Sequence, residues 1–181
     1  MTRALRTRPR RNLSLAEDAA GATAEPARPH NELWDRPGYL VRRLHQIHVA
    51  MFLEECSEDN ITPIQYGLLS ILASRPAMDQ ITLATELGID RTNVADVLSR
   101  LEKRGLVARG HDDTDYRVRL AALTGKGRAL VMRNNQAMKR AQTRLLAPLP
   151  EASREVFVRL LRDLVDANDG HSRAPTKQRA G

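Results

Sequence analysis

The chain has 181 residues, of which 41% are hydrophobic and 28% are charged, a mixture that excludes a collagen-like or wholly disordered chain. No run of residues approaches the roughly 18 consecutive apolar side chains of a membrane helix, so no membrane partner is expected. The N-terminus is basic but lacks the apolar core of a secretory signal, and the single cysteine, Cys56, cannot form an internal disulfide. One globular domain in the cytoplasm is predicted.

The net charge of +7 lies mostly at the two ends of the chain. Residues 1–30 and 170–181 carry +3 each, whereas 31–169 carry only +1. Because both end segments have few large apolar side chains, we expect 1–30 to be a disordered basic arm and 170–181 a disordered tail. Residues 91–128 carry +4, so a nucleic-acid site is expected there. Aromatic residues make up only 3%, which argues against single-strand binding by base stacking.

Six helices are predicted from apolar residues at helical spacing and from capping residues at the helix ends. Thr62-Pro63-Ile64-Gln65 is a capping box that begins the second helix. Asp79, Asp90 and Thr124 are N-cap residues of the third, fourth and fifth helices, and Gly88 and Gly105 end the third and fourth. In chain order the helices span about 38–57, 62–74, 79–88, 90–105, 124–146 and 151–167.

Two short runs at 106–109 and 117–123, rich in β-branched residues or leucine, predict a β-hairpin after the fourth helix. A short helix, a four-residue turn, a longer helix and a basic hairpin, in that order, are the layout of a winged helix-turn-helix. The fold class is therefore predicted to be mainly α with a small β-hairpin wing. Such a protein places its second helix in the major groove of duplex DNA.

The helix that begins after Asp90 has an apolar back and a polar front. Residues near the start of such a helix reach base edges, and arginine suits guanine whereas asparagine suits adenine. The predicted base readers are Arg91, Thr92 and Asn93. Asp96 either accepts a hydrogen bond from cytosine or orients a neighbouring arginine, and we favour the second role. Phosphate contacts are expected from Arg100, Lys103 and Arg104.

The hairpin supplies the second part of the predicted DNA interface. Asp115 and Arg117 lie on the same side of a strand, so the carboxylate is expected to fix and aim the guanidinium group. An arginine aimed in this way suits the negative potential of a narrow minor groove. Arg119 on the same strand completes the predicted DNA-contacting set.

Three stretches of this region match a known pattern: Asp90-Arg91-Thr92-Asn93-Val94, Leu101-Glu102-Lys103-Arg104-Gly105-Leu106-Val107, and Asp112-x-x-Asp115-x-Arg117-(x5)-Leu123-Thr124-x-Lys126-Gly127-Arg128. With them, residues 33–168 resemble the MarR (multiple-antibiotic-resistance regulator) family of bacterial winged-helix repressors. The resemblance implies a homodimer whose first and last helices interleave, with two winged lobes on a palindromic operator. It also implies that Arg117 is the wing arginine that enters the minor groove.

The resemblance gives the domain organisation. A MarR-type domain is expected over 31–169, with a DNA-binding lobe at about 61–124 and dimerisation helices at about 33–58 and 125–168. The arm at 1–30 either adds phosphate contacts or is a dispensable tail, and we favour the first role. The protein would act in a bacterial cytoplasm, associated with the nucleoid, and no cofactor is expected.

Family members release DNA when a small molecule, often an aromatic acid, binds beside the dimer helices. The segments 33–48 and 62–67 resemble members that control aromatic-acid catabolism. The implied function is repression of an aromatic-compound catabolic or efflux operon, relieved by a small aromatic acid or its CoA thioester.

The residues themselves point to where such an acid would bind. His48 falls inside the apolar stripe of the first helix with His45 on its flank, and a carboxylate would give either ring a partner. The alternative is a histidine bonded to a backbone carbonyl. Arg42 or Arg43 is a candidate carboxylate clamp. The candidates to cover an aromatic ring are Trp34, Tyr39 and Tyr66.

Other functions are less well supported by the sequence. A redox sensor would use Cys56, but the acidic residues on both sides of this thiol should raise its pKa. A metal sensor would use His45 with His48, or His111 with Asp112, Asp113 and Asp115, although turn formation also explains the acidic residues. A helical interaction protein without DNA binding would not need the basic hairpin. No nucleophile constellation or phosphate-binding loop indicates an enzyme.

Overall fold

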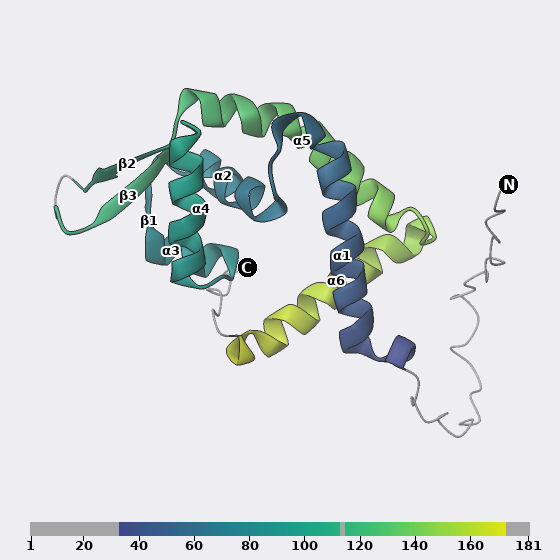
Figure 1. Ribbon diagram of the computed structural model, residues 1–181. Helices are drawn as coiled ribbons and strands as arrows, with labels where there is room; N and C mark the ends of the chain where they lie inside the picture. Colours follow the sequence, from purple (N-terminus) through teal and green to yellow (C-terminus); the bar gives the residue numbers. More distant parts are fainter. Residues whose placement is uncertain (1–32, 113–114, 173–181) are drawn as a thin grey trace, which may run out of the picture. The chain divides into compact units, whose positions relative to one another are not determined.

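The computed structural model describes residues 33–112 and 115–172 (Figure 1). The predicted basic arm, Asp113 and most of the predicted tail lie outside the described residues. Contacts between Cα atoms divide the chain into one unit that ends at Leu40 and another that begins at Val41. In the first unit the structure describes the 3-10 helix η1, Leu33–Asp35, and the first residues of helix α1, Pro37–Glu55.

The first helices of the second unit follow the predicted capping signals. The 3-10 helix η2, Ser57–Asp59, follows α1, and Thr62 caps helix α2, Pro63–Ser74. The backbone N–H of Gln65 donates to Thr62 Oγ1 over 3.3 Å, and the Thr62 N–H donates back to Gln65 Oε1 over 3.2 Å. The predicted capping box is therefore confirmed. It fixes where α2 begins and with it the packing of α2 against the rest of the core.

Helices α3, Gln80–Leu87, and α4, Arg91–Lys103, form the helix-turn-helix. Asp79 caps α3, and Asp90 Oδ1 accepts from the backbone N–H of Asn93 over 2.9 Å to cap α4. Gly88 and Gly105 follow the two helices with φ of 66° and 69°, a left-handed conformation that costs glycine least. The tight turn between the two helices thus has the local cause that the sequence predicts.

Three short antiparallel strands form a sheet in the order β1-β3-β2. Strands β2, Val107–His111, and β3, Arg119–Leu123, make the hairpin that extends from the helices in Figure 1. The predicted strand bounds were wrong by about two residues. The N–H of Asp112 donates to the Val118 carbonyl over 3.0 Å, so pairing continues through His111 and the turn begins later. Strand β1, Met78–Asp79, was not predicted because two residues show no periodicity.

Two long helices complete the fold: α5, Gly125–Leu146, and α6, Glu151–Asn168, followed by the 3-10 helix η3, Asp169–His171. The six α-helices of the described residues agree with the predicted ranges to within about two residues. No helix in the described part of the chain is long and apolar enough to cross a membrane.

One hydrophobic core joins α1, α2, α3, α4 and α5 with the sheet. Its fully buried side chains include Phe52, Leu68, Leu83 and Leu101. Helix α6 contributes none of its described residues to this core. Instead, it exposes large aliphatic side chains: Val156, Val158, Leu160, Leu164 and Val165. The core that holds the helix-turn-helix and the hairpin is therefore complete without α6.

Candidate nucleic-acid interface

Helix α4 presents a polar face to solvent and buries the opposite face. Val94 and Leu101 are fully buried, and Val97 and Leu98 are nearly so. The exposed residues of the helix include five of those predicted to contact DNA and one predicted to orient an arginine: Arg91, Thr92, Asn93, Asp96, Arg100 and Lys103. The apolar back thus fixes the helix to the core and leaves its front open, as insertion into a major groove requires.

The side chain of Asn93 completes the helix cap. Its Nδ2 donates to Asp90 Oδ2 over 2.5 Å, while its backbone N–H donates to the other oxygen of the same carboxylate. Asn93 is the third residue of the helix, where a polar side chain can reach back to the cap. The role of Asn93 as a reader of adenine stays a prediction, because this contact uses only one of the two N–H groups of the amide and not its oxygen.

Asp96 contacts Arg100 through its backbone carbonyl and not through its carboxylate. The Nε of Arg100 donates to the backbone carbonyl of Asp96 over 3.3 Å, and the Asp96 carboxylate is not the acceptor. The arginine is thus directed by the helix backbone, which leaves its side chain exposed on the same face as Lys103.

Arg104 connects the end of α4 to the segment after α1. Its Nη1 donates to the Asn60 carbonyl over 3.0 Å and its Nη2 to the Asp59 carbonyl over 2.6 Å. Both terminal nitrogens therefore have partners inside the protein. This structural role was missed because 44 residues or more separate the partners, and the phosphate contact stays a prediction, since each of these nitrogens has a second N–H.

The turn of the hairpin is built on aspartate carboxylates. Asp112 Oδ1 accepts from the N–H of Asp115 over 3.1 Å, and Asp115 Oδ1 accepts from the N–H of Arg117 over 3.0 Å. Turn formation thus explains both carboxylates. The predicted contact between the Asp115 carboxylate and the Arg117 guanidinium is wrong in detail, because the carboxylate binds the backbone. The Arg117 side chain is exposed near the hairpin tip.

His111 and Tyr116 brace the same turn. Their rings stack with centroids 3.9 Å apart, and His111 Nδ1 lies 2.7 Å from the Tyr116 carbonyl oxygen. Because a carbonyl oxygen only accepts, Nδ1 carries the proton in this contact. The stacking was not predicted, although His111 and Tyr116 flank the turn in the sequence.

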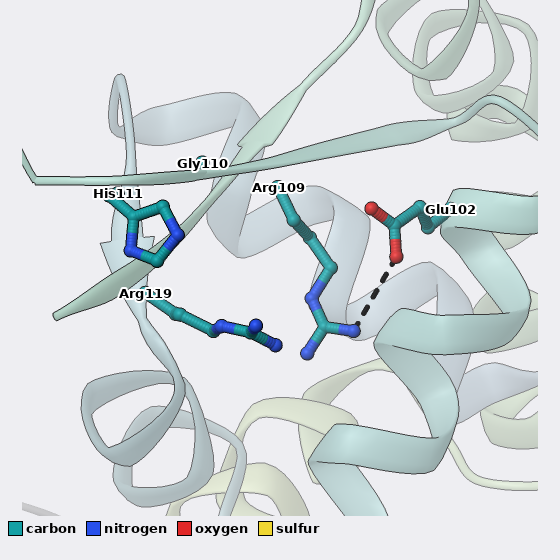
Figure 2. A pocket seen from close by; sticks show the side chains of 5 residues that line it. All are labelled: Glu102, Arg109, Gly110, His111 and Arg119. Carbon is teal, nitrogen blue, oxygen red and sulfur yellow. Dashed lines mark hydrogen bonds and ion pairs between the residues drawn. The ribbon is translucent and has the colours of Figure 1, made fainter. Parts of the chain in front are cut away.

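A pocket of about 200 Å³ lies between α4 and the hairpin. It is lined by Glu102 from α4, by Arg109, Gly110 and His111 from β2, and by Arg119 from β3 (Figure 2). We call it the α4–hairpin pocket. Arg119 belongs to the predicted DNA-contacting set, whereas Arg109 was missed. The sequence signal for Arg109 was its spacing of two residues from His111, which puts both side chains on one face of the strand.

Comparison with known proteins identifies the family. The sequence profile of the MarR family matches residues 61–118. A transcriptional regulatory protein of Thauera aromatica, named for the hcr operon, is 32% identical over 136 residues, which make up 75% of this chain and 82% of that protein. The chain belongs to the MarR family.

Two solved structures extend this result to the fold. BpsR of Bordetella bronchiseptica, whose DNA binding is regulated by 6-hydroxynicotinic acid, is 32% identical with a TM-score of 0.71 over 75% of this chain and 96% of BpsR. PcaV of Streptomyces coelicolor, solved with its natural ligand, is 37% identical with a TM-score of 0.70 over 75% of this chain and 96% of PcaV. This MarR-family protein is a transcriptional regulator with a DNA-binding winged helix and not an enzyme, as predicted.

The predicted effector residues of this MarR-family regulator fall in different environments. His45 is exposed and His48 half-buried, and burial lowers the pKa of His48, helped by the charge of His45. Tyr66 is buried and packs at 5.8 Å against the ring of Phe52 in the core. Arg42 and Arg43 are exposed on α1, and Arg43 donates to Gln46. Trp34 and Tyr39 belong to the unit that ends at Leu40.

The environment of Cys56 does not favour a thiolate. The side chain is buried, and burial raises the pKa of the thiol, as do the charges of Asp59 and Glu55. A sensor thiol needs a lowered pKa and access to oxidant, so this site argues against redox switching. Among the described residues, no three histidine, cysteine or acidic side chains gather as metal ligands. Asp113, part of one predicted metal set, lies outside the described residues.

Carboxylates near the end of α1 bind helix α5. Asp59 accepts from Nε and Nη2 of Arg133 and from Nδ2 of Asn134, and Glu55 accepts from Arg140 and Arg144. The Arg133 hydrogen bond, together with that of Asn134, holds the pKa of Asp59 below its ordinary value despite partial burial. Since Arg104 binds the Asp59 carbonyl, this cluster also connects α5 to the end of α4.

Proposed function

We propose that this MarR-family regulator is a homodimeric repressor that binds a pseudopalindromic operator and releases it when a small aromatic acid or its CoA thioester binds. The observation that carries the proposal is the exposed polar face of α4 beside a basic hairpin, both fixed to one core. Arg91, Thr92 and Asn93 would read bases. The backbone and minor-groove contacts would come from Arg100, Lys103, Arg104, Arg117 and Arg119.

The exposed aliphatic face of α6 supports the dimer. An amphipathic helix that buries none of its residues within its own chain leaves apolar surface in water, and a second copy of the chain would remove that surface. The dimerisation helices predicted from the sequence include α6. Two-fold symmetry would place the two α4 helices about 34 Å apart, one turn of DNA, and so requires an inverted repeat.

The operator proposal is tested by selection followed by one substitution. Selection of bound duplexes from a random pool is expected to enrich an inverted repeat with half-site centres about 10 base pairs apart. On that duplex, Arg117→Ala is expected to lower the affinity about tenfold and to reduce the slope of log affinity against log salt by about 1, because one cation leaves the minor groove. Fluorescence anisotropy at several salt concentrations measures both quantities.

Arg162→Ala is the matched control, because it removes an exposed arginine from the middle of α6. It should change neither affinity nor slope by more than about a third of the Arg117→Ala effect. If no inverted repeat is enriched, the operator proposal fails. If Arg117→Ala behaves like Arg162→Ala, the hairpin is not part of the interface.

The effector proposal is supported by the setting of His48 and by the relatives. A half-buried neutral imidazole with exposed arginines on the same helix offers hydrogen bonds and charge to a carboxylate. The relative BpsR responds to 6-hydroxynicotinic acid, which is an aromatic acid.

Thermal melting with hydroxybenzoates, cinnamates, hydroxynicotinates and their CoA thioesters tests the effector. A ligand at 100 times its Kd should raise Tm by roughly 5–10 °C and weaken operator binding at least about fivefold. His48→Leu should remove most of the Tm shift, whereas His171→Leu, an exposed histidine in η3, should keep it. If no acid shifts Tm, the effector proposal fails while operator binding stands.

A further inference from the structure

The α4–hairpin pocket holds more positive than negative charge. Arg109 and Arg119 both line it, and Figure 2 shows the guanidinium group of Arg119 pointing toward that of Arg109. Glu102 is the one acidic side chain in the lining, and it contacts Arg109 through a single pair of atoms 3.5 Å apart. Two like charges directed into one pocket repel each other unless an anion lies between them.

The strand register explains why these cations converge. His111 is paired with Arg119 across the β2–β3 ladder, so their side chains leave the same face of the hairpin. Arg109 lies two residues before His111 and therefore shares that face, which is turned toward α4. The stack of His111 on Tyr116 fixes the end of this face nearest the turn. The arrangement is thus set by backbone pairing rather than by the rotamers of exposed side chains alone.

The side chain of Arg109 is partly buried, and its contact with Glu102 is weak. Its side chain is only 22% exposed, whereas that of Glu102 is 44% exposed. A guanidinium removed from water in this way is best compensated by a bidentate anion, and one contact at 3.5 Å supplies little of that compensation. Among the described residues, the Arg119 guanidinium has no hydrogen-bond or ion-pair partner.

We infer that the α4–hairpin pocket binds one phosphodiester group of the operator backbone, with Arg109 and Arg119 as its two cationic ligands and Glu102 as a built-in competitor. The inference rests on the proposed function, because it needs duplex DNA on α4 and the hairpin. Glu102 holds Arg109 in the free protein and weakens the phosphate site by its charge. The site therefore adds a DNA contact to those of the exposed residues of α4 and of the hairpin tip.

The position of the pocket selects its occupant. When α4 lies in a major groove and the hairpin tip reaches the neighbouring minor groove, the DNA backbone that separates the two grooves passes between α4 and the hairpin. That backbone presents phosphates and no base edges, so it matches a pocket in which positive charge exceeds negative charge. A volume of about 200 Å³ is smaller than the roughly 300–1,000 Å³ of small-molecule sites but holds a phosphate group.

Charge variants on the selected operator test the inference. Glu102→Gln removes the competitor and should raise the affinity about three- to fivefold at constant salt. Arg119→Gln should lower the affinity about five- to tenfold and reduce the salt slope by about 1. The matched controls are Glu155→Gln and Arg162→Gln, which make the same chemical changes at exposed sites of α6 and should each stay within about twofold of the wild type.

Operators with a single uncharged methylphosphonate then locate the phosphate. At one position in each half-site, this substitution should weaken wild-type binding about tenfold but Arg119→Gln binding less than about twofold, because the partner is already absent. Thermal melting in inorganic phosphate against chloride at equal ionic strength separates free phosphate from DNA phosphate as the occupant.

The outcomes are distinguishable. If the wild type selects no operator, the proposed function fails first. A second outcome is that the wild type binds an operator while every methylphosphonate weakens the binding of Arg119→Gln as much as that of the wild type. The inference is then overturned, and the proposed function still stands. A Tm rise in inorganic phosphate with a flat methylphosphonate scan also overturns it, since the pocket would then hold only free phosphate. If Glu102→Gln binds the operator no more tightly than Glu155→Gln does, Glu102 is not a competitor of the phosphate.

Discussion

Gly127→Ala is expected to destabilise the protein by about 3 kcal/mol and to lower Tm by roughly 6–12 °C. A Cβ at this position would lie 2.1 Å from the carbonyl oxygen of Leu106 and 2.8 Å from Cδ1 of Leu123. The first of these atoms is backbone immediately before β2, and the Thr124 N–H donates to it. The clash can be relieved only by moving the start of α5 away from the hairpin.

Gly125→Ala is the matched control for this prediction. It makes the same chemical change two residues earlier, at the first residue of α5, where a Cβ meets nothing within 4 Å. Its Tm should equal or exceed that of the wild type, because alanine favours a helix over glycine. Thermal unfolding followed by circular dichroism compares the three proteins. Equal Tm values for the two variants would show that α5 and the hairpin separate without cost.

Asp59→Ala is expected to cost about 2–3 kcal/mol at pH 7, measured by urea unfolding. The substitution removes the acceptor for Arg133 and for the buried Asn134, so a buried amide loses a partner. Glu58→Ala is the control, because this neighbouring acidic residue is exposed. It should change the free energy of unfolding by less than about 0.5 kcal/mol.

The pH dependence of the free energy of unfolding separates the contribution of the Asp59 charge from that of the side-chain shape. Its pKa in the folded protein is below the ordinary 3.8, so its charge stabilises the fold fully above that value and progressively less as pH falls through the lowered pKa. The stability difference between the wild type and Asp59→Asn should therefore be constant from pH 7 to about 5 and shrink below about pH 4. A difference that grew toward acid pH would contradict the assigned direction.

The helix ends were predictable because their causes are local. Thr62, Asp79 and Asp90 cap helices with atoms no more than three residues away, and the two positive-φ glycines follow in sequence. The face of α4 that meets solvent was equally predictable from a repeat of apolar residues. These features need only the neighbouring sequence and the geometry of a helix.

The contacts in the interface that were not predicted depend on competition between partners. Asn93 carries side-chain groups suited to a base, but one N–H of its amide donates to Asp90, three residues away. Asp115 prefers backbone N–H groups of its own turn over the Arg117 side chain. Arg104 finds its acceptors 44 and 45 residues away, and Asp59 binds Arg133 across 74 residues. A single sequence does not rank such partners without the tertiary packing.

The division between the core and α6 sets how strongly the proposed dimer can read DNA. Each lobe is folded by side chains of its own, and α6 adds none of its described residues to that core. In the proposed dimer, α6 would act as a tether between the two DNA-binding lobes. Once one lobe is bound, the tether raises the effective concentration of the other at the second half-site. Avidity, rather than the contacts of either lobe alone, would then decide which operators are occupied.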